Sequence, residues 1–122
     1  HRDKEGLLMA NFVDFDSMYG HRRNAQGYAQ CLEDFDAMLG ELLPLLQDDE
    51  LLMITSDHGN DPTMSGTDHT REEVPLVAYS PSLTESTDLG TRLTFADLGQ
   101  TIMDNFDAGK LPFGTSFLND LK

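Results

Sequence analysis

The chain has 122 residues, enough for one domain with a buried core, and its 22 acidic and 8 basic residues give a formal net charge of -14. This charge repels the phosphate backbone of DNA and RNA and disfavours an anionic membrane surface, so we expect neither nucleic acid nor a membrane as a partner. The apolar runs are too short to span a bilayer, the start HRDKEG is no signal peptide and the single Cys31 forms no internal disulfide, so a cytoplasmic location is expected.

Two segments in the first half of the chain have clear patterns. Residues 7 to 15, LLMANFVDF, are mostly apolar and end among aspartates, which predicts a buried strand with carboxylates at its carboxyl end. From Tyr28 to Leu46 the apolar residues are spaced by three and four, which predicts an amphipathic helix. Pro44 is expected to kink that helix or to end its regular hydrogen bonding, because proline has no N–H to donate.

Two further strands and a second helix are expected in the rest of the chain. Residues 51 to 56, LLMITS, are a short apolar run that stops at the sequence DHG, and residues 74 to 80, VPLVAYS, follow a long polar loop. A second helix is expected to open at residues 94 to 97, and the last segment, GKLPFGTSFLNDLK, is expected to be a closing loop or a short terminal strand. This order indicates an α/β fold with a mainly parallel sheet flanked by helices.

Potential metal ligands collect where the first two expected strands end, and ligands of open α/β sheets bind outside these carboxyl ends. The side chains concerned are Asp14, Asp16, His21, Asp57, His58, Asp68 and His69. A mixed set of carboxylates and imidazoles suits Mn²⁺, Zn²⁺ or Fe²⁺ better than Ca²⁺, which prefers oxygen alone. About five ligands exceed one tetrahedral zinc site, so the set indicates two ions.

Each of these residues also has an ordinary explanation. A lone Asp-His-Gly is common at turns, where glycine supplies the left-handed conformation. Asp14 and Asp16 alternate along the expected strand and face opposite sides, so only one of the two is expected to bind metal. The later Asp-His pair could be solvated in its loop. Arg22 and Arg23 are more simply surface or ion-pairing residues than phosphate clamps, although arginine does suit phosphate.

Three segments together resemble the carboxy-terminal part of phosphopentomutases, which belong to the alkaline-phosphatase superfamily. The segments are VDFDSMYGHRRNAQGYAQCLEDFD, ITSDHGNDPTMSGTDHTREEVPLVAYSP and TFADLGQTI, and they lie along nearly the whole chain. The resemblance implies that residues 1–122 are the carboxy-terminal part of an alkaline-phosphatase-like core, with the amino-terminal part and the cap domain absent. The start at His1 in place of methionine agrees with a processed, tagged or excised piece.

Position by position, the resemblance also implies a ligand set. Asp16, His21 and His69 would form one metal site, and Asp57 and His58 would contribute to a second. The family uses two Mn²⁺ ions and interconverts ribose 1-phosphate and ribose 5-phosphate, and the deoxyribose pair, in nucleoside catabolism. Its phosphorylated threonine and first metal-binding aspartate belong to the missing amino-terminal part, which is the expected partner of this piece. We therefore expect no catalytic residue here and no activity from the piece alone.

Two other functions remain open at this point. A related metal-dependent phosphatase or a cofactor-independent phosphoglycerate mutase would use a similar ligand set, and the complete chain would then not isomerise pentose phosphates. From a different class, the piece could be a metal-binding structural module.

Overall fold

The computed structural model describes residues 5–121, which fall into two compact parts. As far as they are described, the first part comprises residues 5–44 and 58–73, and the second comprises residues 45–57 and 74–121. Within residues 5–121, no helix has both the length and the apolar character that crossing a membrane requires.

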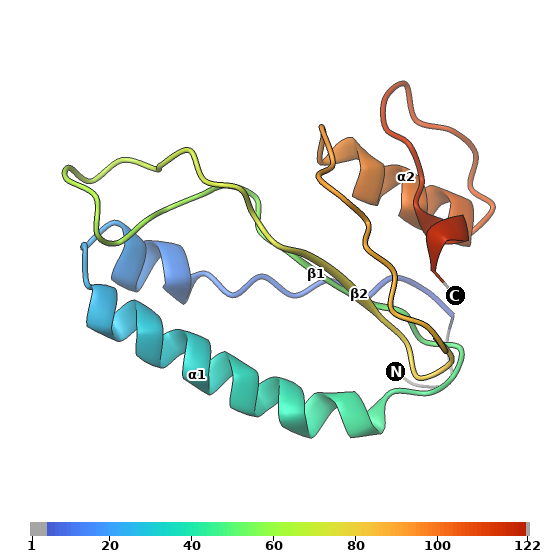
Figure 1. The fold of residues 1–122 in the computed structure, drawn as a ribbon, viewed down its shortest axis with the longest axis horizontal. Coiled ribbons are helices and arrows are strands. Elements are labelled where there is room, and N and C mark those ends of the chain that lie inside the picture. Colours follow the sequence, from blue (N-terminus) through green and yellow to red (C-terminus); the bar gives the residue numbers. More distant parts are fainter. Residues whose placement is uncertain (1–4, 122) are drawn as a thin grey trace. The chain divides into compact units, whose positions relative to one another are not determined.

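A long amphipathic helix is the main element of the first part (Figure 1). This helix, α1, covers Ala25–Leu42, and the side chain of Asn24 caps its start by accepting a hydrogen bond from Gly27 N at 3.0 Å. Regular helix ends before Pro44, in the 3-10 helical turn Leu43–Leu45. The helix expected from the apolar spacing is therefore confirmed, together with the effect of the proline.

The strand expected over residues 7 to 15 is absent from the described residues. Residues 7–12 are extended without a strand partner, and Phe15–Gly20 form a π-helix, η1. Phe15 packs edge-on against Tyr28 and Phe35 of α1, with ring centroids 5.6 and 5.9 Å apart. The physical reason for the difference is that a strand needs a hydrogen-bonded neighbour, whereas the end of this segment finds its contacts on a helix.

The second part contains a two-stranded sheet, and its strands run antiparallel. The strands β1 (Leu52–Thr55) and β2 (Leu76–Tyr79) pair with Leu52 opposite Tyr79. Both strands lie where the sequence predicts them, but the mainly parallel sheet is not what the described residues form. Parallel neighbours need a crossover connection, usually a helix, and the chain between β1 and β2 contains none.

The second predicted helix is confirmed as α2, Ala96–Asn105, and it carries three buried residues, Asp97, Gln100 and Thr101. Phe117 and Thr101 are both fully buried. The Thr101 hydroxyl donates to Asp97 O at 2.8 Å and accepts from Phe117 N at 3.0 Å. The closing segment, which contains the 3-10 helical turn Leu118–Asp120, is therefore fastened to α2 by buried hydrogen bonds.

The carboxylate of Asp97 accepts two more hydrogen bonds where the closing segment meets α2. It accepts hydrogen bonds from Thr115 N at 2.8 Å and from Arg92 Nε at 2.7 Å. The bond from Thr115, followed by the hydrogen bond and charge of Arg92, outweighs the opposing effect of burial, so the pKa of Asp97 lies below its ordinary value. The ionised carboxylate of Asp97 therefore helps to hold the end of the chain in place.

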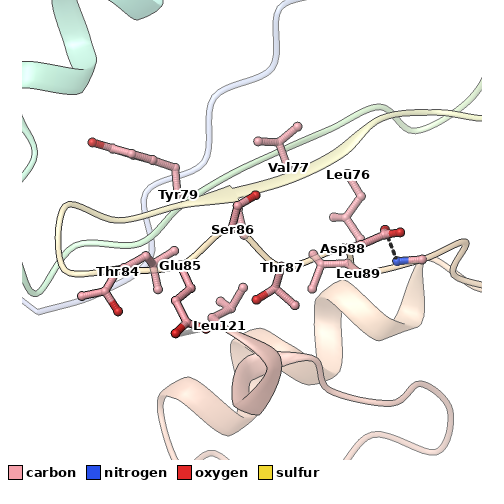
Figure 2. Close-up of a pocket in the computed structure, with 13 residues that line it drawn as sticks. Leu76, Val77, Tyr79, Thr84, Glu85, Ser86, Thr87, Asp88, Leu89 and Leu121 are labelled. Atoms are coloured by element: carbon pink, nitrogen blue, oxygen red, sulfur yellow. Dashed lines mark hydrogen bonds between the residues drawn. The ribbon is translucent and has the colours of Figure 1, made fainter.

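A hollow of about 540 Å³ lies beside β2 in the second part (Figure 2). It is lined by β2, residues 83–90 and Leu121, and Asp88 accepts a hydrogen bond from Gly90 N at 2.8 Å along its wall. Its lining mixes short hydroxyl and aliphatic side chains with Tyr79, Glu85 and Asp88 and includes no histidine, so it lacks the imidazole ligands expected of the metal site.

Candidate metal centre

A closed loop in the first part brings two histidines together. Gly59 and Thr70 form an antiparallel bridge, in which Thr70 N donates to Gly59 O at 3.0 Å. His58 and His69 flank this bridge, and their rings stack with centroids 3.6 Å apart. A Cβ at position 59 would lie 2.7 Å from Thr70 O, so only glycine allows the two ends of the loop to approach this closely. The glycine of the DHG sequence thus places the two imidazoles side by side.

The π-helix η1 supplies a carboxylate to the same place. Asp16 Oδ1 lies 3.4 Å from His69 Nε2, and Asp16 Oδ2 lies 3.3 Å from Nε2 of His21, the residue that follows η1. The two Nε2 atoms of His21 and His69 are 3.1 Å apart. Potential ligand atoms of Asp16, His58 and His69 all lie within 4.8 Å of one another. The sequence therefore folds so that one carboxylate and three imidazoles meet.

The hydrogen bond of the His21 ring shows which nitrogen is free to bind a cation. His21 Nδ1 lies within hydrogen-bond distance of Thr67 O. A carbonyl oxygen only accepts, so Nδ1 carries a proton, and in the neutral ring Nε2 is then the atom whose lone pair can bind a cation on the side of Asp16 and His69. Metal-binding histidines are commonly oriented by such a contact to a main-chain carbonyl. A cation between His21 Nε2, His69 Nε2 and the Asp16 carboxylate would stabilise these closely spaced electron-rich atoms. The donor set therefore fits a divalent ion.

A buried amide holds the carboxylate of Asp16. Asn60 is only 8% exposed, and its Nδ2 donates to Asp16 Oδ1 at 2.6 Å. Burial acts to raise the pKa of Asp16, but the hydrogen bond from Asn60 and the three neighbouring histidines together lower it, so the net pKa lies below its ordinary value. Asp16 is therefore ionised at neutral pH, as a metal ligand must be.

The structure brings together four of the five residues expected as ligands: Asp16, His21, His58 and His69. Asp57 is exposed and belongs to the other compact part, and its role as a ligand stays a prediction. Asp14 begins η1 and is exposed, and Asp68 is exposed in the loop, so neither joins the group. Of the two alternating aspartates, the structure places only Asp16 beside the histidines.

Sequence analysis missed Asn60, a polar residue beside this group, and the role of Arg23, which contacts it. Arg23 NH1 donates to Asn60 Oδ1 at 2.8 Å, whereas sequence analysis weighed this arginine only as a surface or ion-pairing residue or as a phosphate clamp. The two residues are 37 positions apart, and no local pattern links them. Their roles become visible only when the loop has closed.

Two comparisons with known proteins bear on this site. A family model described as the Metalloenzyme superfamily matches residues 1–110, a range that includes all four grouped residues. The chain is also similar to a phosphopentomutase of Levilactobacillus brevis, with 57% identity over 120 residues that cover 98% of this chain and 30% of that protein. The chain therefore spans less than a third of the length of this curated relative.

Proposed function

Because this chain belongs to the Metalloenzyme superfamily, we propose that it is the carboxy-terminal metal-binding part of a phosphopentomutase. The proposed activity of the longer protein is the interconversion of ribose 1-phosphate and ribose 5-phosphate, and of the deoxyribose pair, so its substrate is a pentose phosphate. The 57% identity to the phosphopentomutase of Levilactobacillus brevis supports the choice of reaction. The structural observation that carries the proposed metal-binding role is that potential ligand atoms of Asp16, His58 and His69 lie within 4.8 Å of one another.

The ion we propose is Mn²⁺, with two ions in the complete enzyme. Asp16, His21 and His69 would hold one ion, and Asp57 and His58 would contribute to the other. The chemistry of the donor set supports manganese, since mixed carboxylate and imidazole ligands suit it. His58 stacks on His69, with centroids 3.6 Å apart, so a second site that includes His58 would be adjacent to the first. Such ions, when bound, neutralise phosphoryl oxygens and activate an attacking oxygen for in-line displacement.

The residues of this chain serve the reaction by binding and orienting. Asp16 is ionised and fixed by Asn60, and His21 is held in one tautomer by Thr67 O. We assign the phosphorylated threonine and the recognition of the sugar to the remainder of the longer protein. The cytoplasm is the proposed location, and the free thiol of Cys31 fits a reducing compartment.

The finer fold is also a proposal. We infer that residues 7–12 form a strand of a mainly parallel, alkaline-phosphatase-like sheet, pairing with strands of the longer protein. The segment is already extended, and its residues Leu8 and Met9 are 86% and 84% exposed. An extended apolar run exposed to this degree is typical of a strand that is buried on both faces when its sheet is complete.

A pair of neighbouring substitutions tests the metal centre. Asp16→Asn and Asp14→Asn each remove one carboxylate from the full chain, but only Asp16 lies beside the histidines. In calorimetric titrations with Mn²⁺ we expect Asp16→Asn to weaken binding by about 100-fold or more, since it removes a ligand, and Asp14→Asn to bind normally. Normal binding by Asp16→Asn would contradict the ligand assignment.

The reaction is tested on the longer protein, which includes the parts that this chain lacks, with manganese and ribose 1-phosphate. Formation of ribose 5-phosphate without inorganic phosphate is the expected result. Release of phosphate without the isomer would favour the related phosphatases and would overturn the mutase proposal. Asp14→Asn again serves as the control, because it should keep the full rate.

A further inference from the structure

We propose that Arg23 is a positioning residue of the metal centre, which fixes the amide of Asn60 and through it the carboxylate of Asp16. This inference rests on the proposed function, since it concerns the same centre. Arg23 would not bind the metal itself but would orient a ligand through Asn60, and no sequence pattern indicates this role.

The side chain of Arg23 binds the loop that ends at His69. Its guanidinium donates to four oxygens, namely Asn60 Oδ1 and the main-chain oxygens of Asp61, Gly66 and Asp68. The bonds to Asn60 and Asp61 are 2.8 and 2.7 Å long. A planar guanidinium carries its donors in a rigid fork and can serve this many acceptors from one point. Arg23 thus ties the turn after η1 to the loop between the stacked histidines.

The same contact sets which way the amide of Asn60 faces. A guanidinium N–H only donates, so the Asn60 atom facing Arg23 is Oδ1, and Nδ2 is the atom left for Asp16. Nδ2 then donates to Asp16 Oδ1 at 2.6 Å. With the amide reversed, two oxygens would face each other and repel. Arg23 therefore decides whether Asp16 is held or pushed away.

The backbone at Arg23 points to the same role. Its φ angle is 52°, in the left-handed region that residues other than glycine, asparagine and aspartate rarely adopt. If the turn alone mattered, glycine or asparagine would suit the position better. The arginine side chain and its contacts are what favour this residue at a strained position near a functional site.

These contacts also argue against Arg23 as a phosphate clamp. Nε, NH1 and NH2 together use four N–H groups on the four loop oxygens, which leaves one N–H of the guanidinium. Bidentate binding of a phosphate needs two parallel free donors. Arg23 is committed to the loop and is not available to a substrate.

The sign of the effect on metal affinity separates positioning from charge. Loss of a positive charge near a cation site strengthens cation binding if only Coulomb forces act. Loss of a group that orients a ligand weakens binding, typically by about 10–100-fold. Arg22 is the adjacent, exposed arginine, so Arg22→Ala is the matched control for charge. Arg23→Lys keeps the charge and loses the fork.

The experiment is a calorimetric Mn²⁺ titration of the full chain, together with the visible absorption spectrum of the Co²⁺-loaded protein, which reports ligand geometry. We expect Arg23→Ala and Arg23→Lys to weaken manganese binding by about 10–100-fold and to alter the cobalt spectrum. Arg22→Ala should do neither. Asn60→Ala removes the donor to Asp16 but leaves Arg23 its three main-chain acceptors, and it should reproduce the spectral change.

The experiment separates failure of the proposed metal centre from failure of the proposed role of Arg23. No manganese binding by the unmodified full chain would overturn the metal centre and this inference with it. Normal binding by the unmodified chain with unchanged affinity and spectrum in Arg23→Ala would overturn the role of Arg23 alone. Should Arg23→Ala fail to fold, Arg23→Lys and Asn60→Ala decide the question, and an unaltered cobalt spectrum in both refutes the inference.

Discussion

The change Gly20→Ala would show how tightly Asn60 is held behind Asp16. A Cβ at position 20 would lie 2.5 Å from Asn60 Nδ2 and 2.7 Å from Asn60 Cγ. Since carbon atoms pack at about 3.5 Å or more, the amide would have to move by about 1 Å. Its hydrogen bond to Asp16 is already short at 2.6 Å, so a shift of that size breaks the bond or displaces the carboxylate.

Two costs determine the magnitude. Overpacking a filled site costs about 1–3 kcal/mol, and loss of a hydrogen bond to a charged group costs about 1.5 kcal/mol or more. We therefore expect Gly20→Ala to lower the free energy of unfolding by about 2–4 kcal/mol. Urea denaturation of the full chain, with metal removed by a chelator, measures this quantity without any contribution from a bound ion.

A second glycine provides the matched control. Gly40 lies in α1 and is exposed, and a Cβ there would meet no atom within 4 Å. Gly40→Ala should raise the free energy of unfolding by about 0.5–1 kcal/mol, because alanine loses less backbone entropy than glycine in a helix. If Gly20→Ala proved neutral or stabilising like Gly40→Ala, the packing argument for Asn60 would be refuted.

Two further predictions concern the closure of α2 on the end of the chain. Because hydrogen bonds from Thr115 and Arg92 hold the pKa of Asp97 below its ordinary value of 3.8, its contribution to stability is present above pH 3.8 and is lost as the pH falls through the lowered folded pKa. Asp97→Asn should therefore lower stability at pH 7 and flatten its decline in acid, as followed by urea midpoints, and parallel pH profiles would contradict this. Thr101→Val should destabilise by about 1–3 kcal/mol because it leaves the buried N–H of Phe117 without an acceptor, whereas Thr101→Ser keeps the hydroxyl. A larger drop in thermal midpoint for the serine variant would count against this explanation.

Local periodicity was sufficient to predict the helices. The apolar spacing of α1 and α2 reflects burial of one face, and this information lies within each segment. The strand predicted over residues 7 to 15 is absent from the described residues, because a strand depends on a neighbour that its own residues do not specify. The aromatic end of that segment instead packs on α1, as the contacts of Phe15 show.

The antiparallel sheet was more accessible to prediction. The residues between β1 and β2 contain polar loop residues and no helical spacing, so the crossover that a parallel pair requires was missing from the sequence. The alternation of strands and helices along the whole chain led us to expect a parallel sheet, although the connection between β1 and β2 contains no helix.

The candidate site was only partly visible in the sequence. Carboxylate and imidazole side chains stand out by their chemistry, and the resemblance selected Asp16 over Asp14. The alternation argument could not make that choice, since Asp16 lies in a π-helix and not in a strand. The contact between Arg23 and Asn60 could not be found in the sequence, because most acceptors of the arginine are main-chain carbonyls, which every residue provides.

The attachment of Arg23 to main-chain oxygens has a consequence for how the loop can vary. The oxygens of Asp61, Gly66 and Asp68 would be present with almost any side chains, and residues 63–67 between them are exposed. We expect substitutions at these exposed positions to be tolerated, except at Gly66, whose φ angle of 82° lies in the left-handed region that favours glycine. An inserted or deleted residue would move the carbonyls away from the guanidinium and separate the two histidines. Over evolutionary time the loop is thus free to change most of its exposed side chains but not its length.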